Sequence, residues 1–176
     1  SSINSTTLLE NFTIQNGSGT NQGGTDYDGG GIYCYWASPV LKDLVIKNNQ
    51  VTNGGGGLKI KDSEPSLMNL IIQNNISGGN GGGILISDCE NISINHCLIN
   101  KNTSSGSGSA IFNSTSNLTI INTTVHGNIS YGNEPSNSAF YSSGNGITTN
   151  VINSIFWNEQ SYGELGGVAG NSGPSY

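Results

Sequence analysis

Apolar residues recur along the chain with a period of about 26 residues, and within each period apolar and polar residues alternate over short runs. Three sets of apolar residues occupy equivalent positions: Leu9, Leu41, Leu67, Ile94, Ile120 and Val151; Ile14, Ile46, Ile72, Ile99, Val125 and Phe156; and Ile32, Leu58, Ile84, Ile111 and Phe140. Two or three short alternating segments in a period of this length are typical of a parallel β-helix. The chain lacks a leucine ladder, which argues against a leucine-rich repeat. It also lacks the 3.6-residue apolar pattern of helical repeats.

The alternation also predicts which side chains point into the coil and which point to solvent. In the run from Ile84 to Ile86, the two isoleucines point inward and Leu85 points outward. Two outward columns follow: Tyr33, Lys59, Leu85, Phe112 and Tyr141 on one face, and Val45, Ile71, Leu98, Thr124 and Ile155 on another. An alternative is that two successive side chains are both buried at a corner, which would shift this assignment.

Glycine and asparagine mark the bends between the strands. Three glycines followed by an apolar residue begin at Gly29, Gly55 and Gly81, where a coil must turn or where backbones approach closely. Asn49, Asn75, Asn102 and Asn128 occupy the same turn of successive coils. Because coils stack about 4.8 Å apart, we expect these amides to form a hydrogen-bonded ladder along the axis.

Composition and charge limit the classes of partner that we expect. The net charge is −6, and the basic residues are all lysines: Lys42, Lys47, Lys59, Lys61 and Lys101. Without a basic stripe to neutralise phosphates, nucleic acid is not an expected partner. No apolar run reaches the roughly 20 residues that cross a bilayer. No signal peptide is visible either, which indicates a mature, trimmed or internal segment. We interpret 1–176 as a single β-helix domain, a fragment of a longer secreted protein.

Three cysteines, Cys34, Cys89 and Cys97, cannot form a closed disulfide framework. We expect each to be a small buried apolar residue, although Cys89 and Cys97 leave one pairing open. His96 and His126 fall in different columns with no serine or carboxylate fixed beside them by spacing, so no catalytic pair is assigned.

The repeat resembles the right-handed parallel β-helix repeats of bacterial surface proteins. NFTIQNG (11–17), GGGIYC (29–34), SPVLKDLVIKNN (38–49) and PSLMNLIIQNN (65–75) carry the resemblance, which extends over the whole chain. It is similar to the GGAI and FxxN repeats of polymorphic outer-membrane proteins and autotransporter-like adhesins, and to secreted proteins with sorting-type C-termini. The resemblance implies an all-β, right-handed parallel β-helix at the cell surface, but this repeat serves adhesins, enzymes and spacers alike.

Polysaccharide-degrading β-helix enzymes are the competing class, because such enzymes use clustered carboxylates, in some members with Ca²⁺. Asp62 and Glu64 fall in register with Asp88 and Glu90 one coil later, which makes these four residues a candidate Ca²⁺ site. Asp26 and Asp28 form a second candidate. The alternative is a solvated acidic turn repeated by duplication, and no arginine stands beside these carboxylates; otherwise no cofactor is expected.

Aromatic side chains are the candidate binding residues. Tyr33, Tyr35, Trp36, Phe112 and Tyr141 are placed to stack on sugar rings. Two long loops, Gly17–Asp28 and Ile129–Ser136, leave the coils at the same turn and carry Tyr27 and Tyr131. The column Val45, Ile71, Leu98 and Ile155 is a candidate face for self-association.

We therefore expect about six coils, roughly 29 Å long, forming a non-catalytic extracellular or cell-surface scaffold. Its partners would be a cell-surface protein, a glycan or copies of itself, as in an adhesin or a fibre. Polysaccharide binding or degradation is the second hypothesis. Ice or mineral binding ranks last, because Thr119, Thr123, Thr124, Thr148 and Thr149 form no regular column.

Overall fold

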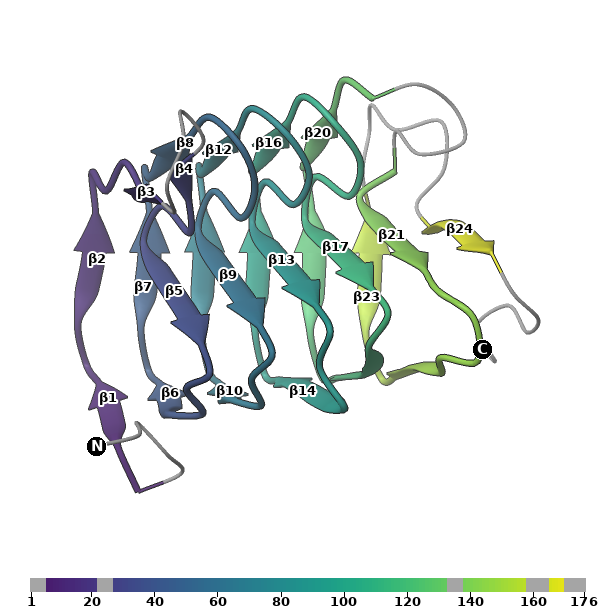
Figure 1. Ribbon diagram of the computed structural model, residues 1–176, viewed down its shortest axis with the longest axis horizontal. Coiled ribbons are helices and arrows are strands. Elements are labelled where there is room, and N and C mark those ends of the chain that lie inside the picture. The colour runs from purple at the N-terminus through teal and green to yellow at the C-terminus, as the bar shows by residue number, and fades with distance from the viewer. Residues whose placement is uncertain (1–5, 22–26, 133–137, 158–164, 170–176) are drawn as a thin grey trace.

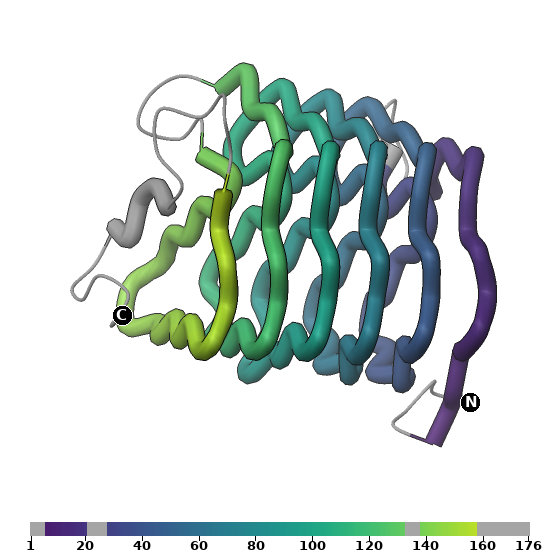
Figure 2. The backbone as a smooth tube through the Cα atoms, turned by 180° about the vertical axis from the view of Figure 1, so that it is seen from behind, coloured from purple at the N-terminus to yellow at the C-terminus, as the bar shows by residue number. Residues whose placement is uncertain are grey.

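The chain forms a solenoid of short parallel strands (Figure 1). The computed structural model describes residues 6–21, 27–132, 138–157 and 165–169, and every described element is a β-strand. Each coil passes through up to four sheets, here numbered 1 to 4 in chain order. Figure 2, seen from behind, shows the coils stacked regularly from the purple to the yellow end.

Sheet 1 has six strands: β5 (Ile32–Tyr35), β9 (Leu58–Lys61), β13 (Ile84–Ser87), β17 (Ile111–Ser114), β21 (Phe140–Ser143) and β24 (Leu165–Ala169). Sheet 2 also has six: β1 (Leu8–Glu10), β6 (Val40–Lys42), β10 (Ser66–Met68), β14 (Asn91–Asn95), β18 (Asn117–Ile121) and β22 (Thr149–Ile152). All neighbouring strands in both sheets are parallel. Parallel pairing is expected because successive coils wind in the same direction.

Sheet 3 has six strands: β2 (Thr13–Gln15), β7 (Val45–Lys47), β11 (Ile71–Gln73), β15 (Leu98–Asn100), β19 (Thr124–His126) and β23 (Ile155–Trp157). Sheet 4 has four very short strands: β8 (Gln50–Val51), β12 (Ile76–Ser77), β16 (Thr103–Ser104) and β20 (Ile129–Ser130). The two-residue strands of sheet 4 are too short to show alternation, so the sequence indicated only two or three segments per coil.

The predicted fold is confirmed, with a refinement of the coil count. Three sheets have six strands, as about six coils require, but only the four coils that begin at β5, β9, β13 and β17 contribute to all four sheets. The predicted register holds at every apolar column; Leu67, for example, pairs with Leu41 on one side and Ile94 on the other. The inward assignment is also right, since Ile46, Ile84 and Ile94 are fully buried.

The two long loops start at the same turn of their coils, as the sequence predicted: the first follows β2 of sheet 3, where Gly17 accepts a backbone hydrogen bond from Gln50 of β8, and the second begins with β20 of sheet 4. The first contains a small antiparallel hairpin, β3 (Thr20–Asn21) with β4 (Tyr27–Asp28). Asp26 and residues 133–136 of the second loop lie outside the described residues. The described part of the chain contains no helix long and apolar enough to cross a membrane.

Candidate binding face on sheet 1

Sheet 1 presents two columns of outward side chains. The first is the predicted column, and strand pairing joins its members in order: Tyr33, Lys59, Leu85, Phe112 and Tyr141. The second lies two residues further along each strand: Tyr35, Lys61, Ser87, Ser114 and Ser143. Leu85, Phe112 and Tyr141 are partly exposed, so the outward assignment is confirmed and the corner alternative is not needed here.

The aromatic residues of this face form two separate groups. At one end, the Tyr33 and Tyr35 rings stack with centroids 5.9 Å apart and an angle of 12° between their planes. Towards the other end, Phe112 and Tyr141 stack with centroids 5.6 Å apart. Leu85 lies between the two groups. The predicted aromatic set is therefore divided into two clusters on the same sheet.

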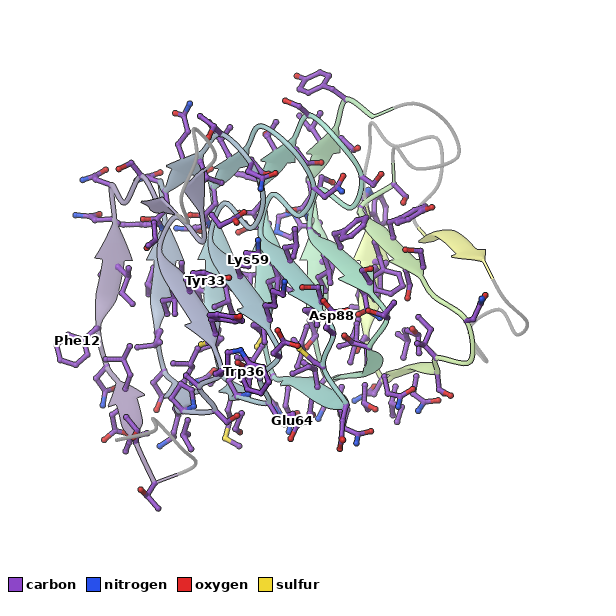
Figure 3. All side chains as sticks on the ribbon, viewed as in Figure 1. Phe12, Tyr33, Trp36, Lys59, Glu64 and Asp88 are labelled. Atoms are coloured by element: carbon purple, nitrogen blue, oxygen red, sulfur yellow. The ribbon has the colours of Figure 1, made fainter. Side chains whose placement is uncertain are left out.

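Two lysines of the next coil lie over the tyrosines, and Figure 3 labels one of these pairs, Tyr33 and Lys59. Lys59 Nζ is 5.5 Å from the Tyr33 ring centroid, and Lys61 Nζ is 6.0 Å from that of Tyr35. Lys59 also forms a salt bridge with Asp28 Oδ2 at 2.6 Å, with both side chains mostly buried. Burial, and secondly the charge of Asp28, raises the pKa of the Tyr33 hydroxyl. The salt bridge with Asp28 holds the Lys59 side chain over the Tyr33 ring.

Trp36 directly follows Tyr35 and adopts a backbone conformation that is unusual for its size. Its φ angle is 50°, in the left-handed region that bulky side chains avoid. The residues after β9, β13 and β17 also have positive φ, but they are the smaller Asp62, Asp88 and Thr115. The Trp36 side chain is 68% exposed and meets Tyr35 edge-on with centroids 6.1 Å apart. A strained backbone thus places the large ring in solvent at the end of sheet 1.

Of the two loop tyrosines, Tyr131 has a described side chain, and it does not join this cluster. Tyr27 belongs to β4, and only its backbone is described. Tyr131 follows β20, so it lies next to sheet 4, whereas Trp36 lies at the corner between sheets 1 and 2. Tyr131 is 70% exposed. Its part in binding stays a prediction.

The four predicted Ca²⁺ ligands lie at the corner between sheets 1 and 2. Asp88 Oδ1 accepts a hydrogen bond from Thr115 Oγ1 at 2.8 Å, and both Asp88 and Glu90 line a shallow cleft there. Within the described residues, however, no three histidine, cysteine, aspartate or glutamate side chains are grouped closely enough to hold a metal ion. Asp62, Glu64, Asp88 and Glu90 form no such group among the described residues, and the Ca²⁺ site stays a prediction from sequence.

The three cysteines are buried, and the two histidines contact asparagines of adjacent coils. Cys34, Cys89 and Cys97 are free and buried, which answers the question of the Cys89–Cys97 pair. Burial raises the pKa of Cys34 to about 12 and that of Cys97 to about 11. His96 and His126 each have an asparagine neighbour on the adjacent coil, Asn122 and Asn100 respectively, at 3.2 and 3.3 Å.

Comparison with known proteins identifies the fold family. The family model for the right-handed β-helix region matches residues 2–164. The chain belongs to the right-handed β-helix family. Comparisons with curated proteins and with solved structures gave no significant match. Family membership agrees with the predicted handedness, while the finer resemblance to adhesin repeats remains an interpretation of the sequence.

Within this β-helix, sequence analysis named the aromatic residues of the binding face but did not group Asp28 and Lys61 with them. The signal was available, because Lys61 is one 26-residue period after Tyr35 and therefore lies beside it on the sheet. The contact between Asp28 and Lys59 was not predictable, because it depends on how the Gly17–Asp28 loop returns to sheet 1.

Proposed function

We propose that this right-handed β-helix is a non-catalytic extracellular or cell-surface scaffold of the adhesin type. It would bind a glycan through a patch made of Tyr33, Tyr35, Trp36 and Lys61, here called the aromatic patch. The observation that carries the proposal is Trp36: a 68% exposed indole on a backbone with φ of 50°. The corner itself requires a positive φ, as Asp62, Asp88 and Thr115 show, but a large exposed ring is not required there. At binding sites strained residues often place a ligand contact.

The chemistry of the aromatic patch fits a sugar. Carbohydrate rings have apolar faces that stack on exposed aromatic rings, and Tyr35 and Trp36 are 46% and 68% exposed. Lys61 forms no salt bridge among the described residues, so its ammonium group is available to donate hydrogen bonds to hydroxyl oxygens. Within sheet 1 the tyrosines of the patch lie on the end strand β5, whose backbone is hydrogen-bonded to β9 of the next coil.

A scaffold function is favoured over catalysis by the surroundings of the patch. Asp28 is 6% exposed and is already paired with Lys59, so it is not placed to transfer a proton to or from a bound sugar. The fold itself does not decide between the two functions, because similar solenoids carry both enzymes and binding proteins.

Glycan binding can be tested with a pair of exposed tryptophans. The purified chain would be applied to an array of neutral and acidic glycans, together with the variants Trp36→Ala and Trp157→Ala. Trp157 is 65% exposed but lies on sheet 3, so it is a matched control. We expect a bound glycan class that Trp36→Ala weakens at least about tenfold, corresponding to one lost stacking contact. Equal loss in both variants, or no binding to any glycan, would contradict the proposal.

Polysaccharide cleavage is a second candidate, favoured by the cleft that contains Asp88 and Glu90. Two carboxylates beside a bound chain are the groups that glycoside hydrolysis requires. Release of reducing ends or of unsaturated sugars, abolished by Asp88→Asn, would replace the scaffold proposal with this one. Binding without product release would support the scaffold.

A further inference from the structure

Sheet 3 has an exposed apolar column that the proposed glycan site does not use. Strand pairing aligns Thr13, Val45, Ile71, Leu98, Thr124 and Ile155 on its outer face. Ile71 is 37% exposed and Ile155 is 61% exposed, and Val45 and Leu98 are partly exposed. The column, here called the sheet 3 ridge, therefore confirms the outward positions predicted from sequence and leaves branched aliphatic side chains in contact with water.

The two sides of the sheet 3 ridge carry opposite charge. On the side nearer sheet 2, Asp43 lies two residues before Val45, and Lys42 forms salt bridges with both Asp43 and Glu10. These two carboxylates and one lysine leave a net charge of −1 on this side. On the side nearer sheet 4, Lys47 lies two residues after Val45, and Lys101 follows β15. Lys47 has no salt bridge among the described residues.

Lys47 and Asp43 stand in columns without a residue of the opposite charge, whereas Glu10 shares its column with Lys42. The column that contains Lys47 continues as Gln15, Gln73, Asn100, His126 and Trp157, with no carboxylate. The turn positions equivalent to Asp43 are Asn11, Asn69, His96, Asn122 and Asn153, with no lysine. The ridge is thus an apolar strip with one acidic and one basic border.

We propose that the sheet 3 ridge binds a second copy of this chain about a two-fold axis that runs along the ridge. Rotation about this axis reverses the strand direction but leaves the order of the coils unchanged. Each coil then meets the same coil of the partner, and the basic border of one copy meets the acidic border of the other.

The charges make this arrangement self-complementary. Asp43 and Lys47 lie on opposite sides of Val45: Lys47 is about 7 Å from it along β7, and Asp43 is at the bend that precedes β7. With the axis over the ridge, Asp43 of each copy faces the lysine at position 47 of the other, which gives two equivalent ion pairs. A two-fold axis along the strands would instead place the coil of Asp43 against a coil near the other end, which has no lysine in the facing column.

The size of the ridge predicts a weak dimer. Six strands about 4.8 Å apart and a width of about 15 Å give roughly 400 Å² per copy, half of what a stable complex usually buries on each partner. We therefore expect a dissociation constant on the order of 100 μM. Such a pair would form where copies are held close together, as on a surface.

Sedimentation velocity at protein concentrations up to about 1 mM, roughly ten times the expected constant, tests the proposal. Leu98→Lys should weaken the dimer at least about tenfold, because it places a charge at the centre of the ridge. The matched control Leu85→Lys introduces the same change on sheet 1 and should alter the constant less than about twofold.

Charge reversal tests the orientation. Lys47→Glu should weaken the dimer, and adding Asp43→Lys to that variant should restore it, because both ion pairs re-form with their signs exchanged. Circular dichroism would check that each variant folds. A monomer at all concentrations, equal effects of Leu98→Lys and Leu85→Lys, or no rescue in the double variant would overturn the proposal. Species that keep growing with concentration would also contradict a closed pair.

Discussion

Asn75 donates a hydrogen bond from its side-chain Nδ2 to Oδ1 of Asn102 at 3.0 Å, and both residues are fully buried. The same contact joins Asn49 to Asn75 at 2.9 Å and Asn102 to Asn128 at 3.0 Å. Each Oδ1 of Asn75, Asn102 and Asn128 also accepts the backbone N–H of the preceding asparagine in the column. The predicted ladder is therefore present, and it satisfies polar groups inside the solenoid as well as joining the coils.

Replacing the central member of the ladder should be costly. Asn102→Leu removes a donor to the backbone oxygen of Ile72 and leaves Asn75 without its acceptor. We expect the free energy of unfolding to fall by about 2–4 kcal/mol, measured by urea denaturation. The exposed Asn91→Leu is the control, with a change of less than about 0.5 kcal/mol. Similar losses in the two variants would show that the ladder adds no stability.

The glycine runs contain positions with different requirements. Gly81 has φ of +66°, and an added Cβ would lie 2.5 Å from the backbone oxygen of Ile84. At Gly83 an added Cβ would lie 2.6 Å from the oxygen of Ala110, but Ala110 itself occupies the equivalent position one coil later. The contact at Gly83 is with the next coil, so a small change in the spacing of the coils can relieve it. The contact at Gly81 is within its own coil, so coil spacing cannot relieve it. Gly81→Ala should lower the free energy of unfolding by about 2 kcal/mol or more, and Gly83→Ala by about 1 kcal/mol. Thermal melting of both variants checks this order, and the reverse order would refute it.

Stability should decrease at alkaline pH because of the buried thiols. Their folded pKa values, about 12 for Cys34 and about 11 for Cys97, exceed the ordinary value of 9.0. Below pH 9 the thiols are protonated in both states, so pH has no effect through them. Between pH 9 and about 11 the unfolded chain loses these protons and the folded chain keeps them, so the free energy of unfolding falls, by about 1 kcal/mol per thiol at pH 10.

Urea denaturation at pH 8 and pH 10 measures this loss, and Cys34→Ala with Cys97→Ala supplies the comparison. The double variant should show a smaller decrease between the two pH values than the unsubstituted chain. A thiol reagent at pH 8 should also react only after denaturation, and rapid reaction of the folded chain would contradict the burial of the three thiols.

The fold followed from the sequence because one physical pattern repeats in it. Inward positions such as Leu41 and Leu67 are apolar in nearly every coil, and a strand register that misplaced them by one residue would expose the whole set. The ladder was predictable for the same reason. Sheet 4 was not, because Ser77, Ser104 and Ser130 point inward there and satisfy their hydroxyls with backbone oxygens instead of showing an apolar pattern.

The site was predictable only in part. Repeat alignment placed Tyr33, Leu85 and Phe112 in one column, but it could not show that the rings stack in two separate pairs or that Trp36 bears a positive φ. Register alone also suggested that Asp62 and Asp88 would share a cation. Residues in register are about 4.8 Å apart at the backbone, but side chains that leave a corner can diverge, and the described carboxylates form no such group.

The most direct test of the binding proposal is to replace Trp36 by asparagine and measure stability and glycan binding on the same samples. Asparagine accepts positive φ easily, so Trp36→Asn should raise the free energy of unfolding by about 0.5–1 kcal/mol. The same variant should lose at least about nine-tenths of its affinity for the glycan that the unsubstituted chain binds. A more stable protein that no longer binds is the predicted result, because the strain then serves the ligand. A variant that is less stable, or one that binds as well as before, would contradict the assignment of Trp36 to a binding site.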